Sequence, residues 1–303
     1  MRPLNPLLWE PQLREWLTED LGRAGDITTD SIVPADAVVR AVVVAREAGV
    51  VAGLTIATRA FSIYDAAVTT ELHTADGCRV TTGEVLATVT GPARAVLTAE
   101  RTCLNVLGHL SGIASATRAV VDLVAPHSAA VVDTRKTTPG LRTLEKWAVT
   151  MGGGANHRFG LDDAVLVKDN HIAVAGGITA AVGSVRARIG HLVKVEVEVD
   201  TLDQLDEVLR LPIDAVLLDN FTLEDLRAGV VRVREAERAV GRSILVEASG
   251  GIRPSTAEAI AATGVDLLSI GWLTNSSPSL DIALDIAPDI APDIGLDIAG
   301  EMP

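Results

Sequence analysis

The chain has 303 residues, of which 48% are hydrophobic and 22% are charged, and this balance excludes intrinsic disorder for the body of the protein. A net charge of −14 and an aromatic content of 3% disfavour nucleic-acid binding and binding to anionic membranes. The two cysteines, Cys78 and Cys103, are too far apart for a C-x-x-C metal motif, so we expect core residues in a reducing compartment. Since neither a signal-peptide pattern nor a membrane-spanning stretch is evident, a cytoplasmic protein is expected.

The first hundred residues mix helical and strand patterns. Apolar spacing predicts a helix over 6–21, a loop over 22–30 and a second helix over 54–64. Runs of β-branched residues between glycines predict strands over 38–45 and 80–89. A long apolar periodicity over 97–124, ended by a proline at 126, predicts one or two helices that lead out of this region.

After residue 126 the pattern becomes regular, with short β-branched runs separated by helix-like segments. The six expected strands cover residues 129–134, 164–168, 193–198, 215–219, 244–249 and 267–271. This alternation is typical of a parallel sheet with helical crossovers. Nearly every strand ends in polar side chains, and barrel enzymes collect their sites from many strand ends, whereas an open sheet uses one switch point. We therefore predict an α/β barrel that is incomplete or borrows a strand.

Positively charged side chains gather near two of these strand ends although the protein is acidic. This cation cluster comprises Arg135, Lys136, His157, Arg158 and Lys168. Such groups bind carboxylates and phosphates, so the cluster predicts a strongly anionic small substrate. Surface salt bridges with Asp162 and Asp163 are the alternative. The glycine run at 152–154 is expected to be a flexible joint before the cluster, and His171 to be a capping residue.

Acidic side chains follow on the next two strands. Glu196 and Glu198 share one face of a strand, and Asp219 ends the following strand. Carboxylate oxygens at neighbouring strand ends suit Mg²⁺ held jointly with substrate phosphates. The alternative is that a glutamate forms a structural ion pair with Lys194 or Arg158.

The last two expected strands end in glycine-containing turns, Ser-Gly-Gly at 249–251 and Ser-Ile-Gly at 269–271. Glycine lets backbone N–H groups approach an oxyanion, and loops after the final strands of such barrels often bind phosphate. Ordinary tight turns are the alternative.

The end of the chain repeats a D-I-A-x unit with an aspartate at every fourth position from 281 to 297. Like charges at this spacing and the prolines at 288 and 292 oppose a helix. We expect an acidic low-complexity tail over 288–303.

Several motifs resemble those of the quinolinate phosphoribosyltransferase family. They are ERTCLNVLGHLSGIAS at 100–115, DTRKTTPGLRTLEKWAVTMGGGANHRFGLDDAVLVKDNHI at 133–172, VEVEVDTLDQL at 195–205, LLDNF at 217–221 and VEASGGI at 246–252. The resemblance covers residues 5–287 and implies an N-terminal open-faced α/β sandwich (1–108), an incomplete parallel α/β barrel (109–273) and a segment (274–287) that packs back on the N-terminal domain. It also implies a homodimer, or a higher multiple of dimers, whose sites combine both subunits.

The resemblance further implies that quinolinate reacts with phosphoribosyl pyrophosphate to give nicotinate mononucleotide, pyrophosphate and CO₂, with Mg²⁺, in the de novo synthesis of NAD. By motif, the implied quinolinate ligands are Arg135, His157, Arg158 and Lys168, with Arg101 of the partner subunit. The implied catalytic residues are Lys136 and Lys168, which meet the pyrophosphate, and Glu198 and Asp219, which hold Mg²⁺ and the ribose. The implied 5′-phosphate ligands are Ser249, Gly250, Gly251 and Gly271.

Two other interpretations stay open at this point. One is a molybdenum-associated pyrophosphorylase-like paralogue, and the other is a non-catalytic phosphate-binding barrel that acts as a sensor. One departure from the family pattern is Asn275, which stands where many relatives carry histidine, so a cationic contribution to phosphate binding is in doubt there.

Overall fold

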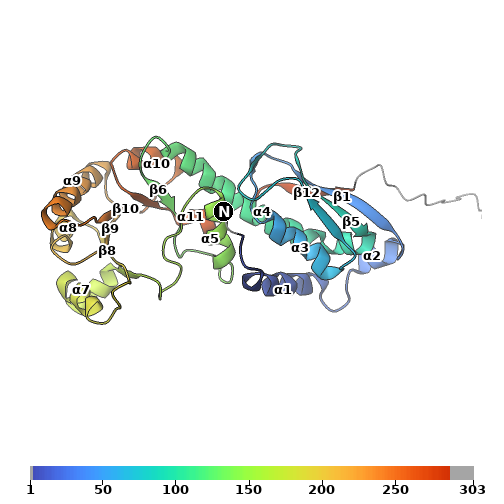
Figure 1. Cartoon of the computed structure of the whole chain (residues 1–303), viewed down its shortest axis with the longest axis horizontal. Helices are drawn as coiled ribbons and strands as arrows, with labels where there is room; N and C mark the ends of the chain where they lie inside the picture. Colours follow the sequence, from blue (N-terminus) through green and yellow to red (C-terminus); the bar gives the residue numbers. More distant parts are fainter. Residues whose placement is uncertain (1–2, 287–303) are drawn as a thin grey trace, which may run out of the picture. The chain divides into compact units, whose positions relative to one another are not determined.

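The computed structural model (Figure 1) describes residues 3–286. Contacts divide the described residues into two units, one formed by residues 3–115 together with 278–286, and the other by residues 116–277. The boundaries expected at 108 and 273 stay predictions, and residue 287 and the acidic tail expected over 288–303 lie outside the described residues. Within 3–286, no helix has the length and apolar character needed to cross a membrane.

The first unit is the predicted α/β sandwich, an antiparallel sheet with strand order β12-β1-β5-β3 accompanied by helices. Its strands are β1 (Val38–Ala45), β2 (Gly49–Val50), β3 (Thr69–Leu72), β4 (Arg79–Val80), β5 (Val85–Pro92) and β12 (Ile282–Ile286). Its helices are η1 (Pro6–Leu8), α1 (Glu10–Leu21), α2 (Ile27–Ile32) and α3 (Leu54–Tyr64), and α4 (Ala93–Val124) runs from this unit into the second. The predicted strand over 38–45 and helix over 54–64 are confirmed, and the apolar stretch from 97 belongs to one helix.

Three details of the first unit differ from the sequence prediction. The helix expected over 6–21 is a 3-10 turn followed by α1, whose first turn contains Pro11; proline lacks an N–H and is tolerated only near a helix start. The loop expected over 22–30 contains the start of α2, because Asp26 caps it by accepting from the Thr29 N–H at 2.9 Å. The strand expected over 80–89 is split into β4 and β5 by a turn at Gly83, whose φ is 85°.

The second unit contains all six strands expected after residue 126, in one parallel sheet. They are β6 (Ala130–Val132), β7 (Val165–Val167), β8 (Val195–Val199), β9 (Ala215–Asp219), β10 (Leu245–Ser249) and β11 (Leu267–Ser269). The helices are α5 (Arg142–Met151), α6 (Asp169–Ala175), α7 (Ile178–Arg186), α8 (Leu202–Val208), α9 (Leu223–Val240), α10 (Pro254–Ala261) and α11 (Trp272–Asn275). Valines and leucines of the strands pack in one core with the helices.

The strand order decides between a barrel and an open doubly wound sheet. It runs β7-β8-β9-β10-β11-β6, which is the chain order except that β6 closes the series beside β11. In a doubly wound sheet, the order of the strands across the sheet reverses at a switch point. In a barrel, the strands follow one another in chain order around a closed cycle, as they do here. The predicted incomplete barrel is confirmed. Its opening lies between β6 and β7, where an isolated parallel bridge joins Val132 to Ala155.

Candidate active site

The parallel sheet places the predicted residues of the second unit at one edge. Arg135 and Lys136 follow β6, Lys168 follows β7, Glu198 lies in β8, Asp219 ends β9, Ser249 ends β10 and Gly271 follows β11. Because parallel strands share one carboxyl edge, these segments converge although they are far apart in the sequence. The valines of β8 are buried in the core, so the alternating glutamates Glu196 and Glu198 face the barrel interior.

Two guanidinium groups of the cation cluster lie near each other. Burial and the neighbouring charge of Arg135 hold the pKa of Arg158 below its usual range, and Glu196 and Asp163 oppose this shift. Arg158 Nη1 donates to the Ala164 carbonyl at 3.2 Å, and the buried Nε of Arg135 has no hydrogen-bond partner. Two positive charges that lie close together and are partly buried repel each other. Binding of an anion that neutralises both charges is therefore favourable.

The alternative for the cation cluster was surface salt bridges with Asp162 and Asp163, but the hydrogen bonds of the Asp163 carboxylate are with backbone groups. The Asp163 carboxylate accepts the backbone N–H groups of Phe159 and Gly160 at 2.6 and 2.9 Å, and these bonds lower its pKa against the effect of burial. Asp163 therefore shapes the loop that follows Arg158.

His157 is held by two acidic side chains in the barrel interior. Its Nε2 lies 2.9 Å from Glu196 Oε2 and 3.4 Å from Glu247 Oε2, and Glu247 is 1% exposed. Burial lowers the pKa of His157, but the two carboxylates outweigh it and raise the pKa to about 10. Of the two ion pairs considered as the alternative for Glu196, Lys194 contacts Asp214 instead, at 2.8 Å, whereas the charge of Glu196 does act on Arg158, in the direction that raises its pKa.

The ligand atoms of His157, Glu196 and Glu247 lie within 4.8 Å of one another, so this group could hold a metal ion. The acids for which a metal role was expected have other partners. Glu198 forms an ion pair with Lys168, and Asp219 accepts from the Asn220 side-chain amide at 2.6 Å. Glu247 is one of the polar residues near the predicted strand ends, but no specific role was predicted for it; it lies in β10 and contacts His157 in the barrel interior.

A pocket of about 260 Å³ lies at the turns after β10 and β11. We call it the glycine pocket; its lining includes Lys136, Ser249, Gly250, Gly251, Ser269, Gly271 and Asn275. A Cβ at Gly250, where φ is +95°, would lie 2.1 Å from Asn220 Oδ1, and a Cβ at Gly271 would lie 2.7 Å from Lys136 Cδ. Only glycine fits these two positions without a shift of the neighbouring side chains. The glycine turns thus bring together five residues predicted to bind phosphate or pyrophosphate.

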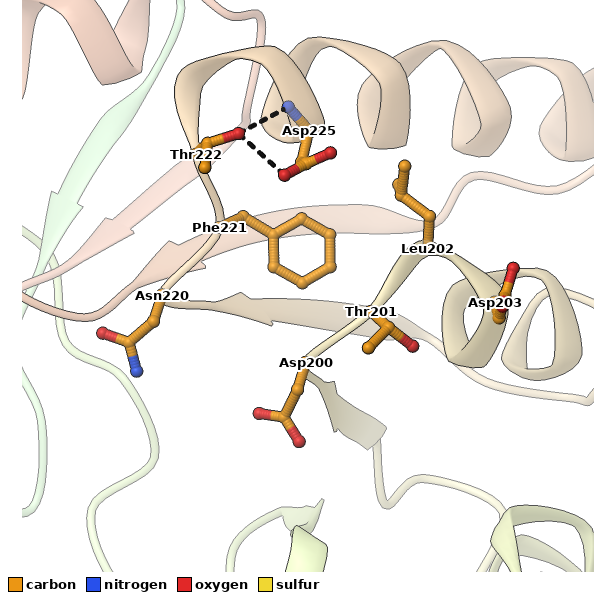
Figure 2. A pocket seen from close by; sticks show the side chains of 8 residues that line it. All are labelled: Asp200, Thr201, Leu202, Asp203, Asn220, Phe221, Thr222 and Asp225. Atoms are coloured by element: carbon orange, nitrogen blue, oxygen red, sulfur yellow. Dashed lines mark hydrogen bonds between the residues drawn. The ribbon is translucent and has the colours of Figure 1, made fainter.

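A second pocket of about 310 Å³ follows β8 and β9 (Figure 2). It is lined by Asp200, Thr201, Leu202, Asp203, Asn220, Phe221, Thr222 and Asp225. Figure 2 shows the Phe221 ring between the two turns, and Thr222 accepts from the Asp225 N–H at 3.1 Å. Among the described residues, Asn220 is the one non-glycine residue with a positive φ, 56°, and asparagine tolerates this conformation best. Sequence reasoning did not single out this acidic pocket.

Three remaining predictions concern single positions. His171 is confirmed as a cap, since its Nδ1 accepts from the Lys168 N–H at 2.9 Å. The run 152–154 forms a hydrogen-bonded turn, in which the Gly154 N–H donates to the Val149 carbonyl at 3.0 Å. Arg101 lies on α4 in the first unit, with a side chain 64% exposed, and it lines two pockets of that unit.

Comparison with known proteins identifies the family that this chain resembles along most of its length. Residues 26–111 match the family described as quinolinate phosphoribosyl transferase, N-terminal domain, and residues 113–285 match the corresponding C-terminal domain. The chain is 45% identical over 274 residues to nicotinate-nucleotide pyrophosphorylase [carboxylating] of Mycobacterium leprae, covering 89% of this chain and 94% of that protein. It is 40% identical over 280 residues to quinolinate phosphoribosyltransferase [decarboxylating] 1b of Nicotiana tabacum, covering 88% and 79% respectively. The solved structure of the nicotinate-nucleotide pyrophosphorylase from Francisella tularensis superposes with a TM-score of 0.87 at 35% identity, covering 94% of this chain and 98% of that one.

Proposed function

The chain belongs to the quinolinate phosphoribosyltransferase family, and from this we propose that it transfers the phosphoribosyl group of phosphoribosyl pyrophosphate to quinolinate with loss of CO₂. The products are nicotinate mononucleotide and pyrophosphate, and the enzyme is a pentosyltransferase of de novo NAD synthesis. The observation that carries the proposal is that paired guanidinium groups and a glycine-lined pocket occupy one edge of the same sheet. This edge offers separate places for a dicarboxylate and for a sugar phosphate.

Quinolinate carries two carboxylates, and the cation cluster suits them. Arg135 and Arg158 repel each other in the free protein, so a dianion between them relieves an existing electrostatic cost. His157 is held beside them by Glu196 and Glu247, whose carboxylates raise its pKa to about 10. Lys168 is available once it exchanges Glu198 for substrate. We also assign Arg101 of the partner subunit, in a homodimer, to the quinolinate site. The exposed side chain of Arg101 supports this assignment.

Phosphoribosyl pyrophosphate is anionic at both ends of the ribose. We assign its 5′-phosphate to the glycine pocket, where the turns at Ser249–Gly251 and Gly271 leave room for backbone N–H groups to face the oxygens. Lys136 lines the same pocket, and we assign to Lys136 and Lys168 the neutralisation of the pyrophosphate as it leaves.

The bound metal is proposed to be Mg²⁺, which supplies charge neutralisation at the leaving pyrophosphate. Its proposed ligands are Glu198 and Asp219, whose hard oxygen atoms on neighbouring strands suit this ion. The group formed by His157, Glu196 and Glu247 is a second place where a metal ion could bind.

In the proposed reaction the quinolinate nitrogen attacks the ribose carbon while the bond to pyrophosphate breaks. Positive charge develops on the sugar, and the carboxylates of Glu198 and Asp219 stabilise it. The pyridine nitrogen is then positive, so it accepts the electron pair released when the adjacent carboxylate leaves as CO₂, and a proton replaces CO₂ on the ring carbon. The cation cluster mainly orients the ring for both steps.

Release of labelled CO₂ from carboxyl-labelled quinolinate tests the proposal. We expect release that requires both phosphoribosyl pyrophosphate and Mg²⁺, and we expect no pyrophosphate to form when nicotinate replaces quinolinate as the acceptor. A molybdenum-associated paralogue would not discriminate for quinolinate in this way, and a sensor would bind phosphoribosyl pyrophosphate without releasing CO₂. We place the enzyme in the cytoplasm, which the free thiols of Cys78 and Cys103 support.

A further inference from the structure

The opening of the barrel between β6 and β7 is bordered by the segment that carries two of the cations. The Ala155 N–H donates to the Val131 carbonyl at 2.8 Å, and the Asp133 N–H donates to the Ala155 carbonyl at 3.2 Å. This short parallel pairing stops there. The next donor, the His157 N–H, is accepted by the side chain of Asp133 at 2.9 Å, so a carboxylate takes the place of a strand carbonyl.

Three donors converge on this one carboxylate. Besides the His157 N–H, Asp133 Oδ1 accepts from Lys146 Nζ. With its amide nitrogen facing the two acceptors, Asn156 donates to Asp133 Oδ2 at 2.6 Å and to the Lys146 carbonyl at 2.8 Å. Asp133 is 0% exposed and Lys146 is 1% exposed. The result is a buried hub that ties β6, α5 and the segment 155–158 together.

A buried ion pair of this kind is costly to form unless each charge is fully satisfied. Burial raises the pKa of Asp133, and Lys146 and the His157 N–H oppose that rise. Lys146 therefore keeps the carboxylate able to accept from the binding segment. Neither residue has a part in the proposed chemistry, although Lys146 is one of only four lysines in the chain.

The hub lies next to both guanidinium groups in the chain. Asp133 precedes Arg135 by two residues on one side, and it anchors the residue before Arg158 on the other. The glycine pocket is held by different bonds, since Thr274 Oγ1 donates to the Lys136 carbonyl at 2.8 Å and the Asn220 N–H donates to the Ser249 carbonyl at 2.9 Å. The hub thus bears on the guanidinium pair and not directly on the turns after β10 and β11.

We propose that the buried Asp133–Lys146 ion pair is a positioning device that sets the distance between the two quinolinate-binding guanidinium groups, Arg135 and Arg158. The proposal rests on the proposed function, because it concerns the affinity for quinolinate. Asp133, Lys146 and Asn156 are positioning residues that act through the cation cluster and do not touch substrate.

The test compares two affinities in one variant. Lys146→Met keeps the length of the side chain but leaves Asp133 without its counter-ion, and we expect the Kd for quinolinate to rise by about tenfold or more, since misplaced binding groups lose affinity steeply. The Kd for phosphoribosyl pyrophosphate should stay within about twofold, because remote sites behave independently. Both are measured by calorimetry on the full-length protein. Lys194→Met, which removes an exposed lysine paired with Asp214, is the matched control and should change neither affinity.

A second variant separates positioning from general stability. In Asp133→Asn with Lys146→Met, an amide oxygen still accepts from the His157 N–H, the Asn156 amide can turn to accept, and neither residue of the former ion pair carries a charge. We expect this double variant to recover quinolinate affinity to within about threefold of the wild type, as coupled neighbours do when both charges are removed.

Each outcome either supports or contradicts the positioning role of the ion pair. Equal losses for both ligands in Lys146→Met, or unchanged quinolinate affinity, would overturn the positioning role while the proposed function stands. Failure of the double variant to recover, with its unfolding temperature restored, would also overturn it. If the wild-type protein itself binds phosphoribosyl pyrophosphate but not quinolinate, the proposed function fails and this inference fails with it.

Discussion

The glycine pocket and the cation cluster lie at one edge of the same sheet, but the chain builds them differently. The pocket is made of backbone turns whose positions are fixed by close packing, such as that of Gly250 on Asn220. The cluster is made of long side chains whose positions are fixed by buried charges, such as Glu247 and Asp133. A backbone site responds to steric change, whereas a side-chain site responds to changes of charge, and variants can separate the two.

The largest effect is expected for Arg135→Ala, which removes one of the two neighbouring guanidinium groups. Loss of a charge-assisted carboxylate contact costs about 2–5 kcal/mol, so quinolinate binding should fall below detection by calorimetry. Affinity for phosphoribosyl pyrophosphate and the fold itself should persist. Unchanged quinolinate affinity would rule out the proposed role of Arg135.

The second largest effect is expected for Gly250→Ala, which disturbs the glycine pocket but does not change any residue of the cation cluster. The new methyl group would meet Asn220 Oδ1 at 2.1 Å in a backbone with φ of +95°, and strain of this kind costs about 1–3 kcal/mol. We expect weaker binding of phosphoribosyl pyrophosphate and a lower unfolding temperature, with little change in quinolinate affinity.

Gly251→Ala is the matched control for this steric effect. Gly251 also has a positive φ, +60°, but its Cβ would meet no atom within 4 Å. A loss in Gly251→Ala as large as that in Gly250→Ala would show that backbone conformation, and not the contact with Asn220, decides the effect.

A smaller effect is expected for Glu247→Gln, and it should appear as a pH dependence. Burial lowers the pKa of His157, but Glu196 and Glu247 raise it to about 10, above the unfolded value of about 6.5. The stability that the charged histidine contributes is therefore complete below about pH 6.5 and is lost as the pH rises through about 10. In the variant this loss, and the accompanying fall in quinolinate affinity, should begin at a lower pH.

The measurement is calorimetry and thermal unfolding of both proteins across that pH range. The affinity for phosphoribosyl pyrophosphate serves as the internal reference, because His157 does not line the glycine pocket. Identical pH profiles for quinolinate binding in the two proteins would contradict a charged His157 in the site.

The smallest effect is expected for removal of residues 288–303. The last described strand, β12, pairs with β1 as far as Ile286, so this truncation retains every described element. Turnover of the truncated enzyme should stay within about twofold of the full chain, as is usual for changes away from a site. A large loss in the CO₂-release assay would assign the acidic repeat a part in activity.

Local patterns in the sequence were sufficient for much of the fold. The β-branched runs located all six barrel strands, because strands buried on both faces read as continuous apolar segments. The glycine pocket was also predictable, since its glycines follow directly on two strands. The predicted element boundaries were less accurate where a single residue determines the local structure. Asp26 is an example, because it caps α2 within a segment that was expected to be a loop.

The buried partners of the cation cluster could not be predicted in the same way. Glu247 and His157 come from segments about ninety residues apart, and Lys146 reaches Asp133 from a helix. Sequence spacing carries no signal for such pairs, because they depend on which strands become neighbours in the closed order. The sequence therefore indicated the candidates for anion binding more readily than the buried side chains that hold these candidates in place.

The opening of the barrel between β6 and β7 has one more consequence. In a regular strand, consecutive side chains leave in opposite directions, so only every second residue can enter the lumen. Beyond its single bridge at Ala155, the chain is released from that alternation, and the charges of both His157 and Arg158 act on the same carboxylate, Glu196. In this six-stranded incomplete barrel, two adjacent positive side chains thereby act on one carboxylate of the barrel interior.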